Sequence, residues 1–475
     1  MEGKEQNRQE GIPLQFCKNK TKRRDKSFNV YIKTFGCQMN KYDSEILEGL
    51  LKTRGFTLTP HIEYADIALF NTCSVREHAE RRVYGQVNML SPQICSLGKS
   101  KRGDNYPNKR IIGVIGCMAQ AHKEKIFDRL PQVDLVCGPQ NLYNIPDYLE
   151  DIAKNNKRIL AVDRRERPVD RENFSFRNKR RYLTAYVTIM EGCNNFCSYC
   201  IVPFVRGREV SRPPSLIIKE IEVLIKKGAK EVTLLGQNVN SYGRDFNNGY
   251  NFIQLLKDID KMHELRRLRF ITSHPKDASD EMFIAMSKLP TVCESLHLPI
   301  QSGSDKILKS MNRKYTREDY LRKVDILRKL IPEVSLTTDI IVGFPNETDE
   351  DFAETIDIMK RVQFDTAYIF KYSPRPYTQA ARLEDNVPKK VKEERHQELL
   401  RLQKNITLSN NKKLINRKVG VLVESADEKG DYLIGRSRTD KVVIFKGPKE
   451  LIGKIVEVRI IDASLANLKG EWIRL

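Results

Sequence analysis

Three closely spaced cysteines follow directly after a predicted β-strand in the middle of this chain. Cys193, Cys197 and Cys200 lie in the segment MEGCNNFCSYC, and the strand is LTAYVTIM. Soft thiolate ligands suit zinc or an iron–sulfur cluster. Since no fourth cysteine is close in the sequence, a cubane cluster held here would leave one iron open to chelate a small molecule. A structural zinc knuckle with a remote fourth ligand is the alternative that the spacing alone leaves open.

This cysteine group belongs to a run of alternating strand-like and helical segments over residues 182–407. Short apolar runs predict buried parallel strands, and apolar residues at three- and four-residue intervals predict the helices between them. Six such units are too few for a closed eight-stranded barrel, so we expect a partial (βα)6 barrel whose functional face lies at the C-terminal ends of the strands. The six strands are LTAYVTIM, EVTLLGQNV, RLRFITS, SLHLPI, LTTDIIVG and TAYIFKYS.

A second group of cysteines is spread through residues 28–153, where a similar pattern predicts a doubly wound α/β domain. Cys37, Cys73 and Cys117 follow the predicted strands NVYIKTF, ADIALFNT and RIIGVIG. Parallel strands end at one edge of a sheet, so we expect the three thiolates to meet there and form another site with an open iron. For any single cysteine the alternative is a buried apolar residue. Cys137, which ends the next strand VDLVCG, is not excluded by position.

The remaining segments differ in composition from these two domains. Short strands with turn residues between them fill residues 408–475, after a predicted helix at about 388–413. They predict a small antiparallel β-barrel of the OB-like kind, and its basic composition favours RNA binding over a packing lid. Residues 1–27 are polar and basic, and we expect a disordered arm there. A charged linker is expected at 154–181 and a loop insertion at 95–108.

Composition favours a polyanionic partner and a cytoplasmic location. Lys and Arg number 83 and Asp and Glu 62, which gives a net charge of +21 and favours nucleic acid or a membrane surface as partner. The N-terminus has no apolar segment typical of an export signal, and the longest apolar run, IIGVIGCMA, is too short to span a bilayer. We expect no membrane association, and we expect the ten cysteines to be ligands, catalytic thiols or buried residues rather than disulfides.

A set of motifs runs through the chain from about residue 28 to residue 475. The motifs are TFGCQMNKYDSE, FNTCSVREHAE, IGCMAQ, CGPQN, MEGCNNFCSYCIVPFVRGREVSRP, LLGQNVNSYG, TSHP, LHLPIQSGSD and DIIVGFPNETDEDF. They resemble the methylthiotransferase family of radical-SAM enzymes. Within that family, GCQMN, NTCSVRE, SRP and GQNVN favour the members that act on N(6)-dimethylallyladenosine at position 37 of tRNA. The C-terminal barrel resembles the family's TRAM domain, an RNA-binding module.

The resemblance implies two 4Fe–4S clusters and two uses of S-adenosyl-L-methionine (SAM). One SAM molecule methylates a sulfur held at an auxiliary cluster, and another is cleaved at the second cluster to a 5′-deoxyadenosyl radical. The radical removes hydrogen from C2 of the adenine, where the methylthio group is then attached. The implied ligands are Cys37, Cys73 and Cys117 for the auxiliary cluster and Cys193, Cys197 and Cys200 for the SAM-binding cluster, which leaves out Cys17, Cys95, Cys137 and Cys293.

The implied partners are a tRNA anticodon stem–loop carrying N(6)-dimethylallyladenosine, an electron donor such as flavodoxin or ferredoxin, and a sulfur source. We expect a monomer. Two alternatives stand beside this interpretation. One is a sibling methylthiotransferase, acting on threonylcarbamoyladenosine in tRNA or on an aspartate of a ribosomal protein. The other is a non-catalytic iron–sulfur protein that binds RNA.

Polar residues at strand ends are candidate SAM contacts, and a helix cap is the alternative for each. They are Tyr199, Gln237, Asn238, Ser273, Gln301, Ser302 and Asp339. Arg206 and Arg208 are candidates to hold the carboxylate of SAM or an RNA phosphate, with a solvated ion pair as the alternative. We interpret His297 as a satisfied barrel histidine.

Three positions depart from the family's usual residues. Asn346 stands where the family usually has Gly, and Tyr377 and Gln379 stand where Gly and Pro are usual. We expect the turn at Asn346 to bend differently and the surface at Tyr377 and Gln379 to alter the face toward the substrate. None of the three is a cysteine, so we expect the chemistry to be kept.

Overall fold

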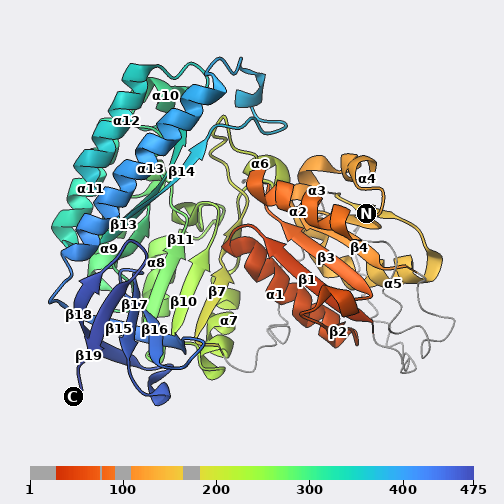
Figure 1. Ribbon diagram of the computed structural model, residues 1–475, viewed down its shortest axis with the longest axis horizontal. Helices are drawn as coiled ribbons and strands as arrows, with labels where there is room; N and C mark the ends of the chain where they lie inside the picture. The colour runs from red at the N-terminus through yellow and green to blue at the C-terminus, as the bar shows by residue number, and fades with distance from the viewer. Residues whose placement is uncertain (1–27, 75–76, 91–108, 164–181, 475) are drawn as a thin grey trace, which may run out of the picture.

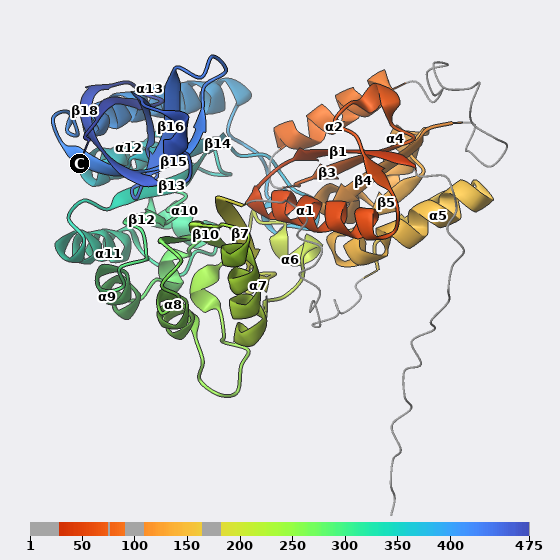
Figure 2. The ribbon, with the colours of Figure 1, turned by 90° about the horizontal axis from the view of Figure 1, so that it is seen from below.

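The computed structural model describes residues 28–74, 77–90, 109–163 and 182–474. Figure 1 shows three units: an N-terminal α/β domain, a central half-open barrel and a C-terminal β-barrel. The N-terminal and C-terminal units lie against different parts of the central one, as the second view in Figure 2 also shows. No helix in these ranges is long and apolar enough to cross a membrane.

The N-terminal domain is built on one parallel six-stranded sheet in the order β2-β1-β3-β4-β5-β6. Every residue of β3 and β4 is buried, as continuous apolar runs require when helices cover both faces of a sheet. The strands are β1 (Asn29–Phe35), β2 (Thr57–Leu58), β3 (Ile67–Thr72), β4 (Ile111–Gly116), β5 (Leu135–Cys137) and β6 (Ile159–Ala161).

Helices cover both faces of this sheet, which confirms the predicted doubly wound domain. One face packs against α1 (Gln38–Thr53) and α5 (Ile145–Asn155), and the other against α2 (Glu77–Met89), α3 (Cys117–His122) and α4 (Lys125–Arg129). The strand order reverses between β1 and β3. At such a point the chain connections that follow the two neighbouring strands run to opposite faces of the sheet. This leaves a crevice between them at the C-terminal edge of the sheet.

The linker predicted at 154–181 begins too early. Helix α5 continues to Asn155, and β6 (Ile159–Ala161) pairs with β5 as the last strand of the first sheet. Three apolar residues are too short a run to be recognised as a strand without their neighbour. The rest of the expected linker from 164, the arm at 1–27 and the loop insertion at 95–108 lie outside the described residues.

The central unit is the predicted partial barrel of six parallel strands. The strands form two three-stranded sheets, β7-β10-β11 and β12-β13-β14, which meet through a single bridge between Leu268 and Val292. They are β7 (Thr184–Thr188), β10 (Glu231–Leu235), β11 (Arg267–Ile271), β12 (Ser295–His297), β13 (Ser335–Val342) and β14 (Thr366–Lys371), with a short hairpin of β8 (Met190–Glu191) and β9 (Val210–Ser211) after β7.

Amphipathic helices pack on the outside of this barrel and bury one continuous apolar core. Side chains alternate along β13, so Thr338 and Ile340 are buried toward the helices while Thr337 and Asp339 are partly open on the inner side. The helices of the unit are α6 (Val202–Val205), α7 (Pro214–Lys226), α8 (Phe252–Asp260), α9 (Asp280–Lys288), α10 (Asp305–Ser310), α11 (Arg317–Leu330) and α12 (Asp349–Val362).

Helix α13 (Lys389–Lys412) leads into a closed five-stranded barrel in the order β15-β16-β17-β19-β18. The expected domain boundary at 407/408 therefore falls inside this helix. The barrel was expected to be antiparallel, but β17 and β19 pair in parallel, because closing five strands with this connectivity leaves one pair running the same way. The strands are β15 (Lys418–Ala426), β16 (Tyr432–Ser437), β17 (Val442–Lys446), β18 (Ile455–Ala463) and β19 (Leu468–Trp472).

The C-terminal barrel docks at the N-terminal ends of the central strands. Arg267, the first residue of β11, is 1% exposed and donates to the backbone carbonyls of Arg436 and Gly420. Arg438 forms a two-pronged ion pair with Glu294, just before β12. This docking closes one end of the central barrel. The opposite end, where the strands finish, faces the N-terminal domain.

Candidate active site

Cys37, Cys73 and Cys117 meet at the C-terminal edge of the first sheet, as the sequence predicts. We call them the N-domain cysteine site. Cys37 follows β1 and precedes α1, Cys73 follows β3, and Cys117 opens α3 after β4. Cys73 and Cys117 are buried, and Cys37 is partly open. The site lies at the β1/β3 switch point, the place where doubly wound sheets bind ligands.

Gly36 allows the ends of β1 and β3 to approach so closely. Its φ is +155°, and a Cβ at this position would lie 2.6 Å from the Cβ of Cys73 and 2.7 Å from Oδ1 of Asn40. Real Cβ atoms do not come this close to another atom, so only glycine lets Cys37 and Cys73 share one site. The Gly-Cys pair in the motif TFGCQMN is therefore a packing requirement of the cysteine site.

A network of amides that sequence reasoning missed holds this edge together. Asn40 donates through Nδ2 to Oδ1 of Asn71 at 2.9 Å, and Asn71 donates in return to the backbone carbonyl of Asn40 and to the hydroxyl of Ser44, both at 2.9 Å. The Cys37 thiol donates to Oδ1 of Asn40 at 3.3 Å. The signal was present in the motifs, since each asparagine lies within three residues of a cysteine.

Arg206 links the central unit to the N-domain cysteine site. The sequence suggested that this arginine holds SAM or an RNA phosphate, or that it forms a solvated ion pair. The structure contradicts the solvated pair: Arg206 is 5% exposed, its ion pair with Asp43 at 2.7 Å is buried, and its Nε donates to Sγ of Cys117 at 3.3 Å. Arg208, by contrast, is exposed and lies over the ring of Phe196.

The thiols of Cys37 and Cys117 differ in acidity. A hydrogen bond with Cys73 and the nearby charge of Arg206 lower the pKa of Cys37 to about 6, against the opposing effect of burial. Burial raises the pKa of Cys117, although Arg206 works in the other direction. Of these two thiols, Cys37 therefore more readily becomes the thiolate that metals bind.

Cys193, Cys197 and Cys200 form the second group, which we call the core cysteine site. They lie on the loop after β8, where Cys193 N–H donates to the carbonyl of Gly207 and Cys200 N–H to that of Cys197. Gly192, with φ of +78°, precedes them; a Cβ there would lie 1.9 Å from the carbonyl oxygen of Arg208. Burial raises the pKa of Cys193 to about 11 and also raises that of Cys200.

Two residues that sequence reasoning missed surround Cys197. The guanidinium of Arg313 donates to Sγ of Cys197 at 3.3 Å and to the hydroxyl of Tyr199 at 3.4 Å. Nε2 of His274 lies 3.9 Å from the same sulfur. His274 belongs to the motif TSHP, so it was visible in the sequence as part of a motif without an assigned role.

A third missed residue, Asp277, ties the loops around the core cysteine site to one another. Its carboxylate accepts from Nδ2 of Asn238 at 2.7 Å and from Nδ2 of Asn195 at 3.4 Å, and it pairs with Arg244 at 2.8 Å. Asn195 belongs to the cysteine loop itself. Asp277 thus fixes the loop after β10 against the loop that carries the thiols.

Of the predicted SAM contacts, two are used by the protein itself in this structure. Gln237 accepts from the backbone N–H of Gly192, and the Ser302 hydroxyl accepts from Ser304 N–H within a turn. The Ser302 hydroxyl thus serves the turn before α10, and the N-cap of that helix is Ser304. Gln301 has φ of +75° and bridges to β13 through its backbone. Tyr199 packs beside Ile307 and Met311 in a small apolar cluster.

Two other candidates, which follow β11 and β10, each have a side-chain polar atom without a hydrogen-bond partner among the described residues. The Ser273 hydroxyl and Oδ1 of Asn238 are buried and have no hydrogen-bond partner within the described residues. Asp339 lies on the inner face of β13, with Oδ2 3.4 Å from Nε2 of His297. The other ring nitrogen of His297 lies 2.9 Å from the Thr337 hydroxyl, so both nitrogens of this histidine have partners, as predicted.

The donor chemistry of both cysteine sites suits an iron–sulfur cluster. Across the described ranges, no three His, Cys, Asp or Glu side chains converge closely enough to hold a single metal ion. In a cubane, each thiolate binds a different iron, so the sulfurs need not converge on one point. Two sites of three thiolates each, both beside a buried arginine, match this requirement. Cys137 and Cys293 are buried within the described part and join neither group, and Cys17 and Cys95 lie outside it.

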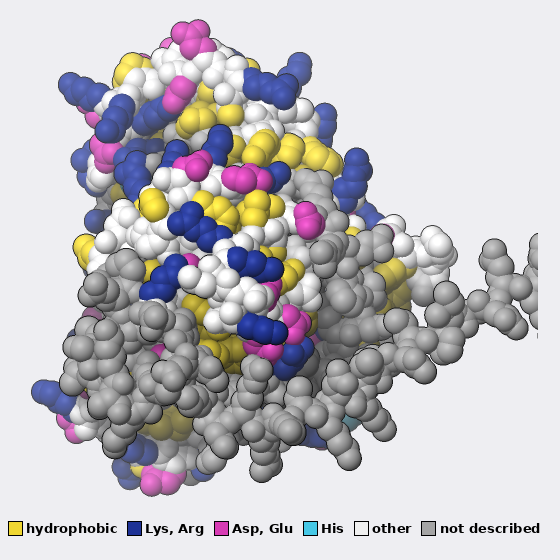
Figure 3. Space-filling view, turned by 90° about the vertical axis from the view of Figure 1, so that its right-hand side faces the viewer, with side chains coloured by type: hydrophobic (Ala, Val, Ile, Leu, Met, Phe, Trp, Pro, Cys, Tyr) yellow, Lys and Arg dark blue, Asp and Glu magenta, His cyan; other side chains and the backbone are white. Residues whose placement is uncertain are grey.

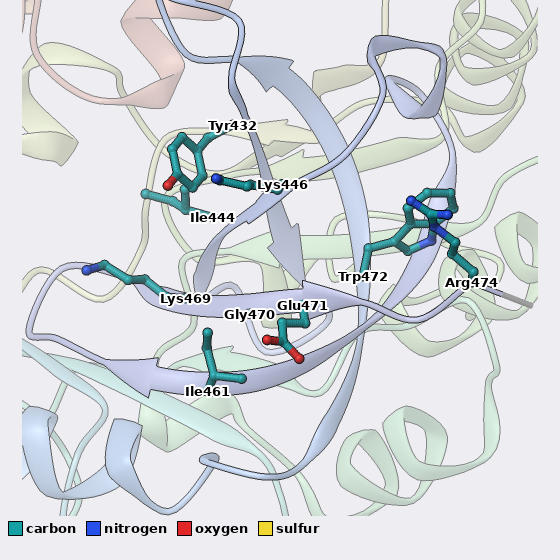
Figure 4. A pocket seen from close by; sticks show the side chains of 9 residues that line it. All are labelled: Tyr432, Ile444, Lys446, Ile461, Lys469, Gly470, Glu471, Trp472 and Arg474. Atoms are coloured by element: carbon teal, nitrogen blue, oxygen red, sulfur yellow. The ribbon is translucent and has the colours of Figure 1, made fainter.

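The C-terminal barrel carries a surface cavity of about 600 Å³. Figure 4 shows Tyr432 beside Lys446 at one end of it and Trp472 beside Arg474 at the other. Each cation lies 5.5 Å from the centre of its neighbouring ring. Tyr432 is exposed and Trp472 is partly buried. Accessible aromatic rings flanked by cations are the features with which proteins stack bases and hold phosphates of single strands. The face shown in Figure 3, in contrast, mixes basic and acidic side chains.

Three family models match the chain. The Radical SAM superfamily matches residues 187–359, "Uncharacterized protein family UPF0004" matches 29–138, and the TRAM domain matches 412–473.

Curated relatives match nearly the whole chain. A relative from Caldicellulosiruptor saccharolyticus is 46% identical over 94% of this chain and 93% of its own length. One from Clostridium botulinum (strain Hall) is 47% identical over 93% and 96%, and one from a Thermoanaerobacter species is 46% identical over 95% and 94%. All three are named tRNA-2-methylthio-N(6)-dimethylallyladenosine synthase.

Solved structures share the fold at much lower sequence identity. The radical S-adenosylmethionine methyltransferase TsrM from Kitasatospora setae, with tryptophan and a SAM analogue bound, superimposes with a TM-score of 0.51 at 14% identity over 75% of each chain. The same enzyme with cobalamin and a [4Fe-4S] cluster gives 0.50 at 12% identity over 75% of this chain and 74% of that one. At this level of identity the likeness concerns the fold.

Proposed function

The chain belongs to the tRNA-2-methylthio-N(6)-dimethylallyladenosine synthase family of radical SAM enzymes, and from this membership we propose that it attaches a methylthio group to C2 of N(6)-dimethylallyladenosine in tRNA. The observation that carries the proposal is the pairing of two three-cysteine sites across one domain junction. Arg206 leaves the core cysteine loop and reaches Cys117 of the other site. The two groups therefore face a common region.

We assign Cys37, Cys73 and Cys117 to the auxiliary 4Fe–4S cluster and Cys193, Cys197 and Cys200 to the SAM-binding one. When bound, the auxiliary cluster supplies a site for the donated sulfur and the other supplies the electron that cleaves SAM. The chain's own residues position these ligands and offset their negative charge.

Residues around the SAM-binding ligands have two roles. Asp277 and Gln237 hold the cysteine loop in place through Asn195 and Gly192. The unused atoms of Ser273 and Asn238 at the ends of β11 and β10 are available to a bound molecule, so we keep both as SAM contacts. Asp339, on the inner face of β13, and Tyr199, on the cysteine loop, remain candidates.

Substrate recognition is assigned to two surfaces. The C-terminal barrel holds the RNA through Trp472, Tyr432 and their flanking cations. Nearer the cysteine sites, Tyr377 is 54% exposed and its ring lies 6.2 Å from that of Phe204, which packs beside Cys117. A loop base is easier to present to such a surface than a base within a duplex. We also propose that the protein works in the cytoplasm, receives electrons from a low-potential donor and receives sulfur from a separate source.

At the three positions that depart from the family's usual residues, the backbone φ angles are ones that the usual residues favour. Asn346 and Tyr377 have φ of +65° and +69°, the left-handed values that glycine favours. Gln379 has φ of −63°, the value that proline fixes. The turn at Asn346 is held by reciprocal hydrogen bonds with Asn386.

Iron and sulfide content after anaerobic reconstitution is the first test, comparing wild type with a Cys193/Cys197/Cys200→Ala variant. We expect about eight irons in the wild type and about four in the variant, from two independent clusters. About four irons in the wild type and none in the variant would remove the auxiliary site from the proposal.

The second test is methylthiolation of anticodon stem–loops with and without the dimethylallyl group. Modification of the prenylated RNA alone, with formation of 5′-deoxyadenosine, is expected. Full activity of Cys37→Ala would contradict the sulfur-donor assignment. Equal modification of threonylcarbamoyladenosine would favour the sibling enzyme, and the absence of 5′-deoxyadenosine would favour a binding protein.

A further inference from the structure

Each cysteine site has one buried arginine that donates to a cysteine sulfur. Arg206 Nε lies 3.3 Å from Sγ of Cys117 in the N-domain cysteine site, and Arg313 Nη1 lies 3.3 Å from Sγ of Cys197 in the core cysteine site. The two contacts have the same length, although the donor atom is Nε in one and Nη1 in the other. They differ in what neutralises the arginine.

Arg206 is neutralised within the protein. Its Nη2 forms an ion pair with Oδ2 of Asp43 at 2.7 Å, and both side chains are almost fully buried. At this short distance the guanidinium and carboxylate cancel one another to a large extent. A negative group at the N-domain cysteine site therefore receives a hydrogen bond from Arg206 but little net positive charge.

Arg313 is not neutralised in the same way. It is 4% exposed, and its other partners are the hydroxyls of Tyr199 and Tyr315 and the carbonyl of Pro299, all uncharged. Among the described residues, no carboxylate lies within ion-pair distance of its guanidinium, and the acidic groups that act on it are Tyr199, Tyr315 and Cys197. A buried cation without a carboxylate is costly unless an anion binds beside it.

His274 adds a neutral hydrogen-bond donor at the same sulfur. Its Nδ1 accepts from the backbone N–H of Lys276 at 3.2 Å, so the ring proton is on Nε2, which lies 3.9 Å from Sγ of Cys197. Cys197 thus receives two side-chain donors, one of them charged. In the N-domain cysteine site, Arg206 donates to the sulfur of Cys117, and the thiols of Cys37 and Cys73 share a hydrogen bond of their own.

We propose that the unneutralised Arg313 makes the core cysteine site the easier of the two to reduce, while the Arg206–Asp43 pair holds the N-domain cysteine site at a lower potential. Net charge and hydrogen bonds to the sulfurs are what set the potentials of such sites. The inference rests on the proposed function. In this proposal, Arg313 and Asp43 are positioning residues, because their charges determine which of the two cysteine sites is reduced first.

The step involves one electron and no covalent change in the protein. A low-potential one-electron donor would be oxidised and a cluster held by Cys193, Cys197 and Cys200 would take up the electron, while Arg313 keeps its proton throughout. In the proposed function, the reaction benefits because the electron goes to the core cysteine site, where SAM would bind, rather than to the N-domain cysteine site, where sulfur would be held.

Redox titration of the reconstituted full chain, followed by electron paramagnetic resonance, tests this directly. Each site is isolated in a background in which the other three cysteines are replaced by alanine, and dithionite is the reductant. In the core-site background, Arg313→Gln should lower the equilibrium constant for reduction at least tenfold, about 59 mV for one electron. Arg313→Lys keeps the charge and should shift it by less than threefold.

The N-domain site tests the same idea in the opposite direction. Asp43→Asn leaves Arg206 unneutralised and should raise the equilibrium constant for reduction there at least tenfold. Arg322→Gln is the matched control: it removes one positive charge from an exposed ion pair with Asp280 and should move neither potential. Iron per chain is measured for every variant. If Arg313→Gln loses its iron, Asp43→Asn still decides the question.

Unchanged potentials in Arg313→Gln and Asp43→Asn with full iron content would overturn the proposal and leave the proposed function intact. A wild type that never loads two clusters would instead refute the proposed function. Equal shifts in Arg322→Gln would show that overall charge, rather than these two positions, sets the potentials, and would also overturn the proposal.

Discussion

The ion pair between Asp43 and Arg206 fastens the N-terminal domain to the central unit, and its removal should be among the most damaging single changes at this junction. The side chains of Asp43 and Arg206 are 4% and 3% exposed, and their charged atoms lie 2.7 Å apart. Replacing one partner leaves a buried charge without its counterion, which costs about 3–5 kcal/mol. Replacing both by apolar residues of similar size removes that charge and should cost much less.

A double-mutant cycle of Asp43→Leu and Arg206→Met measures this coupling. We expect each single variant to lose about 3–5 kcal/mol of unfolding free energy, and the coupling term to exceed the loss of either single variant, because the double variant recovers most of that loss. The free energies come from urea unfolding of the iron-free protein followed by circular dichroism. The bond from Arg206 to Cys117 is lost in both Met variants, so the cycle cancels it.

The pair between Arg54 and Asp147 in the same domain serves as the control. Its atoms lie 2.8 Å apart, but the side chains are 49% and 55% exposed. The same cycle there should give a coupling of at most about 1 kcal/mol, since exposed pairs are screened by solvent. Equal couplings for the two pairs, or a double variant at Asp43 and Arg206 as unstable as either single one, would refute the reasoning from burial.

Three further changes separate packing from binding. Gly192→Ala should lower the free energy of unfolding by at least about 1–3 kcal/mol in thermal denaturation, because the new Cβ would lie 1.9 Å from the carbonyl oxygen of Arg208. Gly85→Ala is the control: Gly85 lies in helix α2 with open space around it, so alanine there should raise the free energy of unfolding by about 0.5–1 kcal/mol. Trp472→Ala should weaken binding of an anticodon stem–loop about 5- to 150-fold in a fluorescence titration without changing iron content, the equivalent of about 1–3 kcal/mol of stacking. Tyr377→Gly should leave the melting temperature nearly unchanged, since relief of its positive φ offsets the lost ring contact, yet weaken binding of the same RNA by at least about fivefold.

Regular elements with a clear apolar period were well predicted. All six strands of the central barrel and four of the six strands of the first sheet appear where the sequence indicated them, because each buries a run of apolar residues that is visible locally. The exceptions are short. Strand β2 has two residues and β6 has three, and such segments become strands only by pairing with a neighbour that the sequence does not identify.

Side chains at the site were harder to assign. Ser302 and Gln237 satisfy turns and loops of the protein, while the unpredicted Asp277 joins three loops through one carboxylate. A polar residue at a strand end is equally suited to bind a ligand or to cap a turn. Only the positions of its neighbours decide between the two.

The sequence by itself indicated the donor chemistry of the two cysteine sites and the place of each site in the fold. Cys37, Cys73 and Cys117 follow three parallel strands of one sheet, and Cys193, Cys197 and Cys200 follow one strand of the central barrel. Chain order and strand direction therefore already place each group of thiols at one edge of its sheet. The tertiary structure decided the electrostatics of those sites. Arg206 reaches Cys117 across 89 residues and Arg313 reaches Cys197 across 116, and Asp43 neutralises one arginine but not the other. Such contacts depend on how two domains and distant loops pack, and no local spacing encodes them, because charge acts through space rather than along the chain.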